Sequence, residues 1–119
     1  MIDVAGTGRL MDAMRSTLFD LEKTIRQRRS ADPSTSYVAK LTTRGRGKIA
    51  QKVGEEAVET VIAAMASDKD GTIGESADLL FHLLVLLGDM DIALDTVLDE
   101  LDRREGVSGI AEKAARQPE

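Results

Sequence analysis

The sequence contains no cysteine and no tryptophan, and it has one histidine among its 119 residues. Without cysteine the chain forms no disulfide, no zinc–thiolate site and no thiol nucleophile, which suits a reducing compartment. One histidine also excludes any multi-histidine metal site built from a single chain. Aromatic residues amount to 3%, and there are two prolines. The alternation of apolar and polar residues that marks strands is lacking too, so helical spacing is the dominant pattern.

An excess of positive charge is also lacking. Sixteen Lys and Arg residues stand against 21 Asp and Glu, which gives a net charge of −5, and such a chain is a poor binder of nucleic acid or anionic membranes. Met1–Leu10 has no apolar core of an export signal. The longest apolar run, Leu79–Leu87, is interrupted by His82 and is far shorter than the roughly 20 residues of a membrane span. We therefore expect a cytoplasmic protein with no nucleic-acid and no membrane partner.

The length fits a single domain over residues 1–119, because a second domain would lack chain for its own core. Residues 1–8 are expected to form a flexible extension and residues 115–119 a loose tail. Residues 37–47 are basic and punctuated by glycine, and their structure stays open at this stage. Apolar residues at every third or fourth position predict four helices. These are Leu10–Arg28, Lys48–Ala66, Ile73–Leu87 and Ile92–Arg104.

The segments between these helices carry turn and stop signals. Residues 30–36 and 67–71 are polar and predict a loop and a turn. Gly88 and Gly106 are expected to end the third and fourth helices. Residues 108–113 are expected to form a short last helix that begins with a serine cap.

The third predicted helix is apolar on almost every side. Its Leu, Val and Phe side chains over residues 79–87 surround the helix axis, so the helix must be buried nearly all round. The other helices of one small chain can hardly wrap it, whereas a second copy of the chain can. The alternative is a monomer with an unusually central helix. We therefore predict an all-α fold of four to five helices, forming a bundle that dimerisation completes.

The second predicted helix carries three glutamates on one side. Glu55, Glu56 and Glu59 fall within an arc of roughly 100°, and Lys48 and Lys52 share that arc. One interpretation is a solvated polar face with Lys–Glu pairs at helical spacing, which is common on amphipathic helices. The other interpretation is a site that uses the carboxylates together.

Polar residues on the apolar third helix favour the second interpretation. Glu75, Asp78 and His82 lie within an arc of roughly 60°. A carboxylate on such a helix costs several kcal/mol unless it is paired or bound to a metal. Glu75 is close enough to the predicted helix start to be explained as a favourable dipole charge. His82 is interpreted as a core histidine with one hydrogen-bond partner.

The short connection between the second and third helices predicts that they run antiparallel, so that their five carboxylates face one another. Hard divalent cations relieve the resulting repulsion, and Mg²⁺ suits an all-oxygen site that also takes water and phosphate. A ferritin-like di-iron site would need Glu-x-x-His, whereas this chain has Glu-x-x-Asp at residues 75–78. Basic side chains precede the acidic motif and are candidates for binding phosphates, with ordinary surface charge as the alternative. They are Lys40, Arg44, Arg46, Lys48 and Lys52.

The two acidic motifs resemble those of a known superfamily. Glu-Glu-x-x-Glu followed by Glu-x-x-Asp, here at residues 55–59 and 75–78, is the motif of the MazG-like all-α nucleotide pyrophosphohydrolases. The wider sequence, over about residues 18–116, is similar to the phosphoribosyl-ATP pyrophosphatase family. Phe81 departs from that family, because many relatives have tyrosine at this position. The matching segments are Ser36-Tyr37, Lys40-Leu41, Lys48-Ile49, Lys52–Glu59, Glu75–Leu87, Arg104–Gly109 and Glu112-Lys113.

The resemblance implies a MazG-like helix bundle, present as a homodimer or higher bundle, that hydrolyses phosphoribosyl-ATP to phosphoribosyl-AMP and pyrophosphate in histidine biosynthesis. It implies Mg²⁺ as the cofactor. The principal ligands, and hence the catalytic carboxylates, would be Glu56, Glu59, Glu75 and Asp78. Glu55 would be a further ligand or the group that orients the attacking water.

The resemblance also bears on phosphate binding and on partners. Lys48 and Lys52 match basic positions of the family, and we assign them, with Lys40 and Arg44, to the substrate phosphates. In some organisms this enzyme is fused to the cyclohydrolase that acts next. That enzyme needs zinc-type ligands, which this chain lacks, so we expect a separate cyclohydrolase to take the product.

Two other functions fit part of the pattern. A house-cleaning pyrophosphohydrolase that acts on dUTP or dCTP would carry the same acidic motif, although residues 36–41 and 108–109 favour phosphoribosyl-ATP. A non-enzymatic helical oligomerisation module would explain the apolar third helix but gives Asp78 no reason to be there. Failure of the folded protein to bind Mg²⁺ would favour the module.

Overall fold

The structure is a computed structural model, and it describes residues 17–105. Within this part of the chain every regular element is helical and no strand is present, which confirms the predicted all-α class. An N-terminal helical segment covers residues 17–28. Four further helices follow, namely α2 (Tyr37–Arg44), α3 (Arg46–Met65), α4 (Lys69–Asp89) and α5 (Leu94–Arg104).

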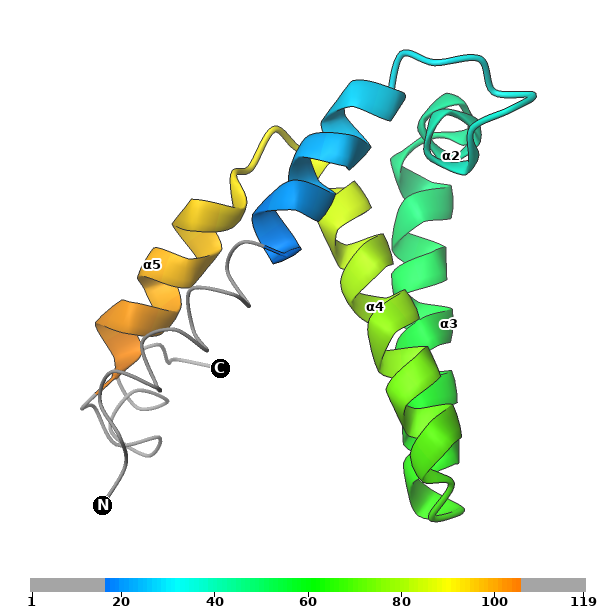
Figure 1. Cartoon of the computed structure of the whole chain (residues 1–119), viewed down its shortest axis with the longest axis vertical. Helices are drawn as coiled ribbons and strands as arrows, with labels where there is room; N and C mark the ends of the chain where they lie inside the picture. The colour runs from blue at the N-terminus through cyan, green and yellow to red at the C-terminus, as the bar shows by residue number, and fades with distance from the viewer. Residues whose placement is uncertain (1–16, 106–119) are drawn as a thin grey trace.

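The long helices α3 and α4 form an antiparallel hairpin, which Figure 1 shows as two green ribbons side by side. Helix α2 packs on the N-terminal end of α3. The segment 17–28 lies by the C-terminal end of α4, where Arg29 Nη1 donates a hydrogen bond of 2.9 Å to the Gly88 carbonyl. The Glu22 carboxylate accepts a hydrogen bond of 2.7 Å from the Leu94 amide and so holds the start of α5. The hairpin predicted from the short connection is therefore confirmed.

The hydrophobic core lies at the end of the hairpin where these elements meet. Each helix contributes at least one buried apolar side chain to it, so no element is merely attached to the surface. Burial of such side chains supplies most of the stability of a helical domain. The buried members are Ile25, Val38, Leu41, Ile49, Leu84, Val85 and Leu94.

The predicted start of α4 was wrong by four residues. Residues 67–71 were expected to be a turn, but the helix begins at Lys69. Asp68 is the N-cap, and its side chain accepts a hydrogen bond of 2.9 Å from the Gly71 amide. The cap satisfies an amide that helix initiation leaves free, and Ser67 makes the tight turn with a φ of 56°.

The predicted end of α4 near Gly88 is confirmed to within one residue, because the helix ends at Asp89. Gly88 is buried, and a methyl group in place of its hydrogen would lie 3.9 Å from Ile25. A methyl group at that distance would make an ordinary van der Waals contact, so the packing of the segment 17–28 does not require glycine here. The chain reverses at Asp91, which has a φ of 56°.

Residues 37–47, for which sequence reasoning gave no structure, contain α2 and the start of α3. The Ser36 hydroxyl caps α2 by accepting a hydrogen bond of 3.1 Å from the Ala39 amide. Gly45 separates the two helices with a φ of 97°, a conformation that favours glycine. The predicted helix at 10–28 is confirmed over 17–28. Its earlier part, the extension, the predicted helix at 108–113 and the tail lie outside the described residues.

Helix α4 is not wrapped by the described part of this chain. It is long and apolar enough to span a membrane by length and composition alone, yet α3 packs along it. Ile73 is 69% exposed and Leu80 is 48% exposed. These side chains form apolar surface that the described part of the chain leaves uncovered.

Candidate metal centre between α3 and α4

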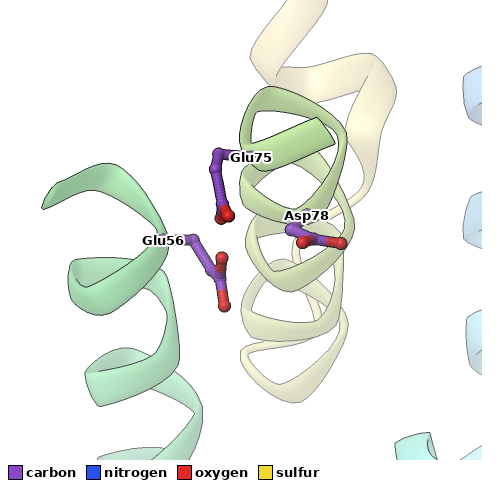
Figure 2. A group of neighbouring side chains, drawn as sticks. All are labelled: Glu56, Glu75 and Asp78. Carbon is purple, nitrogen blue, oxygen red and sulfur yellow. The ribbon is translucent and has the colours of Figure 1, made fainter. Parts of the chain in front are cut away.

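Three carboxylates from two helices converge at the middle of the hairpin. Glu56 comes from α3, and Glu75 and Asp78 come from α4. One oxygen atom of each lies within 4.8 Å of the others. Figure 2 shows the carboxylates of Glu56 and Glu75 meeting between the helices, with Asp78 beside them on α4. The spacing of the two motifs is what brings them together, because Glu75 and Asp78 are one turn apart on the same face.

The burial of these groups fits a cation. Glu56 is 6% exposed. One buried oxygen of Glu56 and one of Glu75 have no hydrogen-bond partner. A buried carboxylate oxygen without a donor is costly, and the usual remedies are a paired charge or a metal ion. An all-carboxylate set suits Mg²⁺, which prefers oxygen ligands.

The electrostatics of the cluster match its geometry. The carboxylates of Glu59 and Glu56 lie close enough to share a proton with Glu75, and together with burial they raise the pKa of Glu75 to about 7. Like charges at this distance cannot all be ionised without a counter-charge. Glu59 is therefore a neighbour of Glu75, although it is not one of the three residues whose oxygen atoms lie within 4.8 Å of one another. Since α4 begins at Lys69, Glu75 lies in its second turn, too far along for the dipole explanation considered from the sequence.

Glu55 is not brought into this group. Its carboxylate accepts hydrogen bonds from Gln51 Nε2 at 2.6 Å and from Lys52 Nζ at 3.3 Å. These two bonds hold the pKa of Glu55 below its ordinary value, and the charge of Lys48 adds a smaller effect in the same direction. Of the five predicted carboxylates, three form the cluster, in which Glu56 is buried and Asp78 is exposed, and Glu55 and Glu59 lie beside it.

The predicted phosphate-binding residues are divided as well. Lys52 Nζ lies 3.6 Å from Glu56 and forms the cationic margin of the cluster, and the hydrogen bond to Glu55 raises the pKa of Lys52. Lys40 and Arg44 are exposed on α2. Arg46 pairs instead with Asp89 at 2.8 Å, which ties the start of α3 to the end of α4.

His82 is a core histidine, as predicted, but with two partners instead of one. It is 5% exposed. Its Nδ1 lies 2.7 Å from the Asp78 carbonyl, which can only accept, so Nδ1 carries the proton. In the neutral ring Nε2 is then an acceptor, and the Tyr37 hydroxyl donates to it at 2.8 Å.

Sequence analysis placed Tyr37 in a segment that matches the family but gave it no role, because residues 37–47 had no assigned structure. Its ring stacks on Phe81 with centroids 6.1 Å apart. Burial raises the pKa of the hydroxyl, Lys52 opposes the change, and the charges of Glu56 and Asp78 add to it. The available signal was the serine that precedes this tyrosine, since serine is a preferred N-cap residue.

Comparisons with known proteins find relatives that cover most of this chain. The family model described as phosphoribosyl-ATP pyrophosphohydrolase matches residues 18–105. A phosphoribosyl-ATP pyrophosphatase of Rhizorhabdus wittichii is 67% identical over 103 residues, which are 87% of this chain and 97% of that protein. That of Novosphingobium aromaticivorans is 64% identical over 96 residues, 81% of this chain and 90% of that protein. That of Zymomonas mobilis is 60% identical over 100 residues, 84% of this chain and 94% of that protein.

Proposed function

Because this chain belongs to the phosphoribosyl-ATP pyrophosphohydrolase family, we propose that it hydrolyses phosphoribosyl-ATP to phosphoribosyl-AMP and pyrophosphate, a step of histidine biosynthesis. The relatives described above are named for this activity, and the match to this chain covers 97% and 90% of the lengths of two of them. The carboxylate cluster is the observation within the chain that supports the same reaction.

The metal is held by Glu56, Glu75 and Asp78, with Glu59 at the edge of the set. Two oxygen atoms of this cluster are buried without a donor, and the ligand atoms lie within 4.8 Å of one another. A Mg²⁺ ion bound there would neutralise the charge of the triphosphate and would make an attacking water more nucleophilic. The chain contributes the position of the ligands, since α3 and α4 hold them before any substrate arrives.

The residues at the margin act on the substrate. Lys52 lies beside Glu55 and Glu56, so its ammonium group reaches a phosphate held at the cluster, and Lys48, one turn earlier, supports it. Lys40 and Arg44 add positive charge from the neighbouring helix α2. Glu55, fixed by Gln51, is placed to orient a water molecule.

The reaction breaks the bond between the α phosphorus and the oxygen that bridges to the β phosphate. Water supplies the hydroxyl that remains on the α phosphate, and its proton passes to a carboxylate of the site or to solvent. Pyrophosphate leaves with the bridging oxygen. The dominant contribution is electrostatic, because negative charge develops next to groups that are already in position.

A second copy of the chain completes the molecule. Ile73, Leu80 and Leu83 on α4 are exposed, and a hollow of about 290 Å³ between α4, α5 and Leu18 has an apolar lining. A homodimer, or a higher bundle, buries this surface. The protein works as a soluble biosynthetic enzyme in the cytoplasm and passes its product to a separate cyclohydrolase.

The decisive experiment measures pyrophosphate release from phosphoribosyl-ATP, ATP, dUTP and dCTP, with and without Mg²⁺. We expect Mg²⁺-dependent release from phosphoribosyl-ATP in clear preference to the others. Preference for dUTP or dCTP would move the function to nucleotide clean-up. Thermal unfolding with and without Mg²⁺ gives an independent measure of the metal site, because a ligand of the folded state raises Tm. No release and no rise in Tm would leave the oligomerisation module as the better account.

A further inference from the structure

Tyr37 holds a half-exposed aromatic ring in a fixed position beside the metal centre. It is the only tyrosine of a chain that has no tryptophan. It is 46% exposed although it contacts two neighbouring side chains. An exposed aromatic ring that is nonetheless held in place is a preorganised surface for a flat ligand.

Three contacts hold the ring. Phe81 stacks against it with an interplanar angle of 24°, and the edge of His82 meets it at 87° with centroids 5.6 Å apart. The hydroxyl donates to His82 Nε2 at 2.8 Å. Since His82 is itself fixed by the Asp78 carbonyl, the position of the Tyr37 ring is tied to the turn of α4 that carries a carboxylate of the cluster.

The ring is also near the groups that bind the triphosphate. The hydroxyl bonds His82 Nε2 at 2.8 Å, and the other nitrogen of that imidazole lies 2.7 Å from the carbonyl of Asp78, whose carboxylate belongs to the cluster. Phe81 stacks against the ring with centroids 6.1 Å apart, and Tyr37 nonetheless stays about half exposed. A nucleotide held by its phosphates at the cluster therefore has an aromatic surface next to it.

We propose that the exposed face of Tyr37 stacks on the purine ring of the substrate while the carboxylate cluster holds the triphosphate. This inference rests on the proposed function, and it names the residue that selects the base. Stacking of a base on an aromatic side chain is worth a factor of about ten or more in affinity. His82 and Phe81 are positioning residues that keep the ring in place.

The first test compares two substitutions at this position. Tyr37→Leu removes the ring, and we expect the KM for phosphoribosyl-ATP to rise about tenfold while kcat falls by a smaller factor. Tyr37→Phe keeps the ring and loses the hydroxyl, so we expect it to retain most of the affinity that Tyr37→Leu loses. The rise in Tm on adding Mg²⁺ should persist in both variants, because the cluster is intact. An unchanged KM in Tyr37→Leu, or equal losses in both variants, would overturn the proposal.

The second test uses the unmodified protein and stands even if Tyr37→Leu does not fold. Because Tyr37 is the only tyrosine, isotope-labelled tyrosine gives NMR ring signals from this residue alone. Phosphoribosyl-AMP with Mg²⁺ should shift these signals upfield through the ring current of the purine, whereas ribose 5-phosphate or pyrophosphate with Mg²⁺ should not. Equal shifts with all three ligands, or none with the purine nucleotide, contradict the proposal.

The same samples separate this inference from the proposed function. If the unmodified protein releases pyrophosphate from phosphoribosyl-ATP but Tyr37 shows neither effect, the function stands and the base-binding role is wrong. If the unmodified protein does not act on phosphoribosyl-ATP, the proposed function is wrong and this inference is wrong with it.

Discussion

At the residue scale, the cluster concentrates negative charge where the described part of the chain offers too little positive charge to balance it. Glu56 is buried and has one cationic neighbour, Lys52, at 3.6 Å. Glu75 has two carboxylate neighbours that raise its pKa to about 7. Folding without metal therefore brings repelling groups together, and binding of a cation releases that unfavourable free energy.

Glu56→Gln tests this balance directly. The amide keeps the shape of the side chain and removes its charge, so we expect turnover to fall roughly a hundredfold or more. In metal-free buffer the same variant should be more stable than the parent, because a buried and poorly compensated charge is gone. The rise in Tm with Mg²⁺ should disappear. Differential scanning calorimetry and a pyrophosphate assay measure these effects.

Two other glutamates provide controls for that experiment. Glu100→Gln alters a partly exposed residue that pairs with Arg103 and Arg104 on α5, and it should leave turnover and the Mg²⁺ effect unchanged. Glu55→Gln should retain the Mg²⁺-induced rise in Tm while lowering turnover, because Glu55 lies at the margin of the cluster. Loss of Mg²⁺ binding in Glu55→Gln would place this residue among the ligands instead.

The raised pKa of Glu75 predicts a pH dependence. The folded, metal-free carboxyl titrates near pH 7 and the unfolded one near 4.5, so between these values the folded state binds more protons. The stability of the metal-free protein should therefore fall as pH rises through this window. Mg²⁺ must displace that proton, and calorimetry in buffers of different ionisation enthalpy should record release of about one proton per site near pH 6 and almost none near pH 8. Proton release that does not change with pH, or that persists in Glu75→Gln, would contradict this assignment.

Much of the site was predictable at this scale because charge on an apolar helix is conspicuous. Asp78 and Glu75 stand out on α4, and the motif spacing placed Glu56 opposite them. The helical arc did not reveal that Glu55 turns toward Gln51 and Lys52. That choice depends on side-chain rotamers, which helical spacing does not fix. The role of Tyr37 was missed because it arises from a contact between residues 45 positions apart in the chain.

At the element scale, the long helices were predicted within a few residues, and the errors came from local capping. Apolar spacing shows where a helix has a buried face, but the start of α4 lies before its first apolar residue. It is set by the Asp68 side chain bonding to the Gly71 amide. The end of α4, by contrast, lies within one residue of the predicted stop near Gly88.

Substitutions at two glycines of α4 test how much the Asp68 cap contributes to stability. Gly74 has open space around it, so Gly74→Ala should stabilise the protein by about 0.5–1 kcal/mol through reduced backbone entropy of the unfolded chain. At Gly71 a new methyl group would lie 2.3 Å from Asp68 Oδ2 and displace the cap. Gly71→Ala should therefore be less stable than Gly74→Ala by about 1 kcal/mol. Urea unfolding of both variants gives the difference.

The cap itself supplies the control for that comparison. In an Asp68→Ala background the cap is already lost, so adding Gly71→Ala should then stabilise the protein as much as Gly74→Ala does. If Gly71→Ala still destabilises the protein in that background, the new methyl group clashes with a group other than Asp68.

At the scale of the whole molecule, one chain leaves apolar surface that its own described helices do not cover. The exposed residues of α4 and α5 adjoin the apolar hollow of about 290 Å³. Sequence reasoning predicted this incompleteness from the apolar circumference of α4. It could not say which side stays open, because that depends on how α5 diverges from the hairpin (Figure 1).

Leu80→Glu tests whether a second copy covers this surface. Leu80 is 48% exposed, lines the hollow and lies outside the carboxylate cluster. A buried charge at the interface would oppose association, so sedimentation should shift from a species of at least twice the chain mass of 12.9 kDa toward the single chain. Leu80→Met conserves volume and should leave the mass unchanged. Because association stabilises the folded chain, the Tm of the parent should rise with protein concentration and that of Leu80→Glu should not. A parent that sediments as a single chain at micromolar concentration would show instead that α4 tolerates its exposed face without a partner.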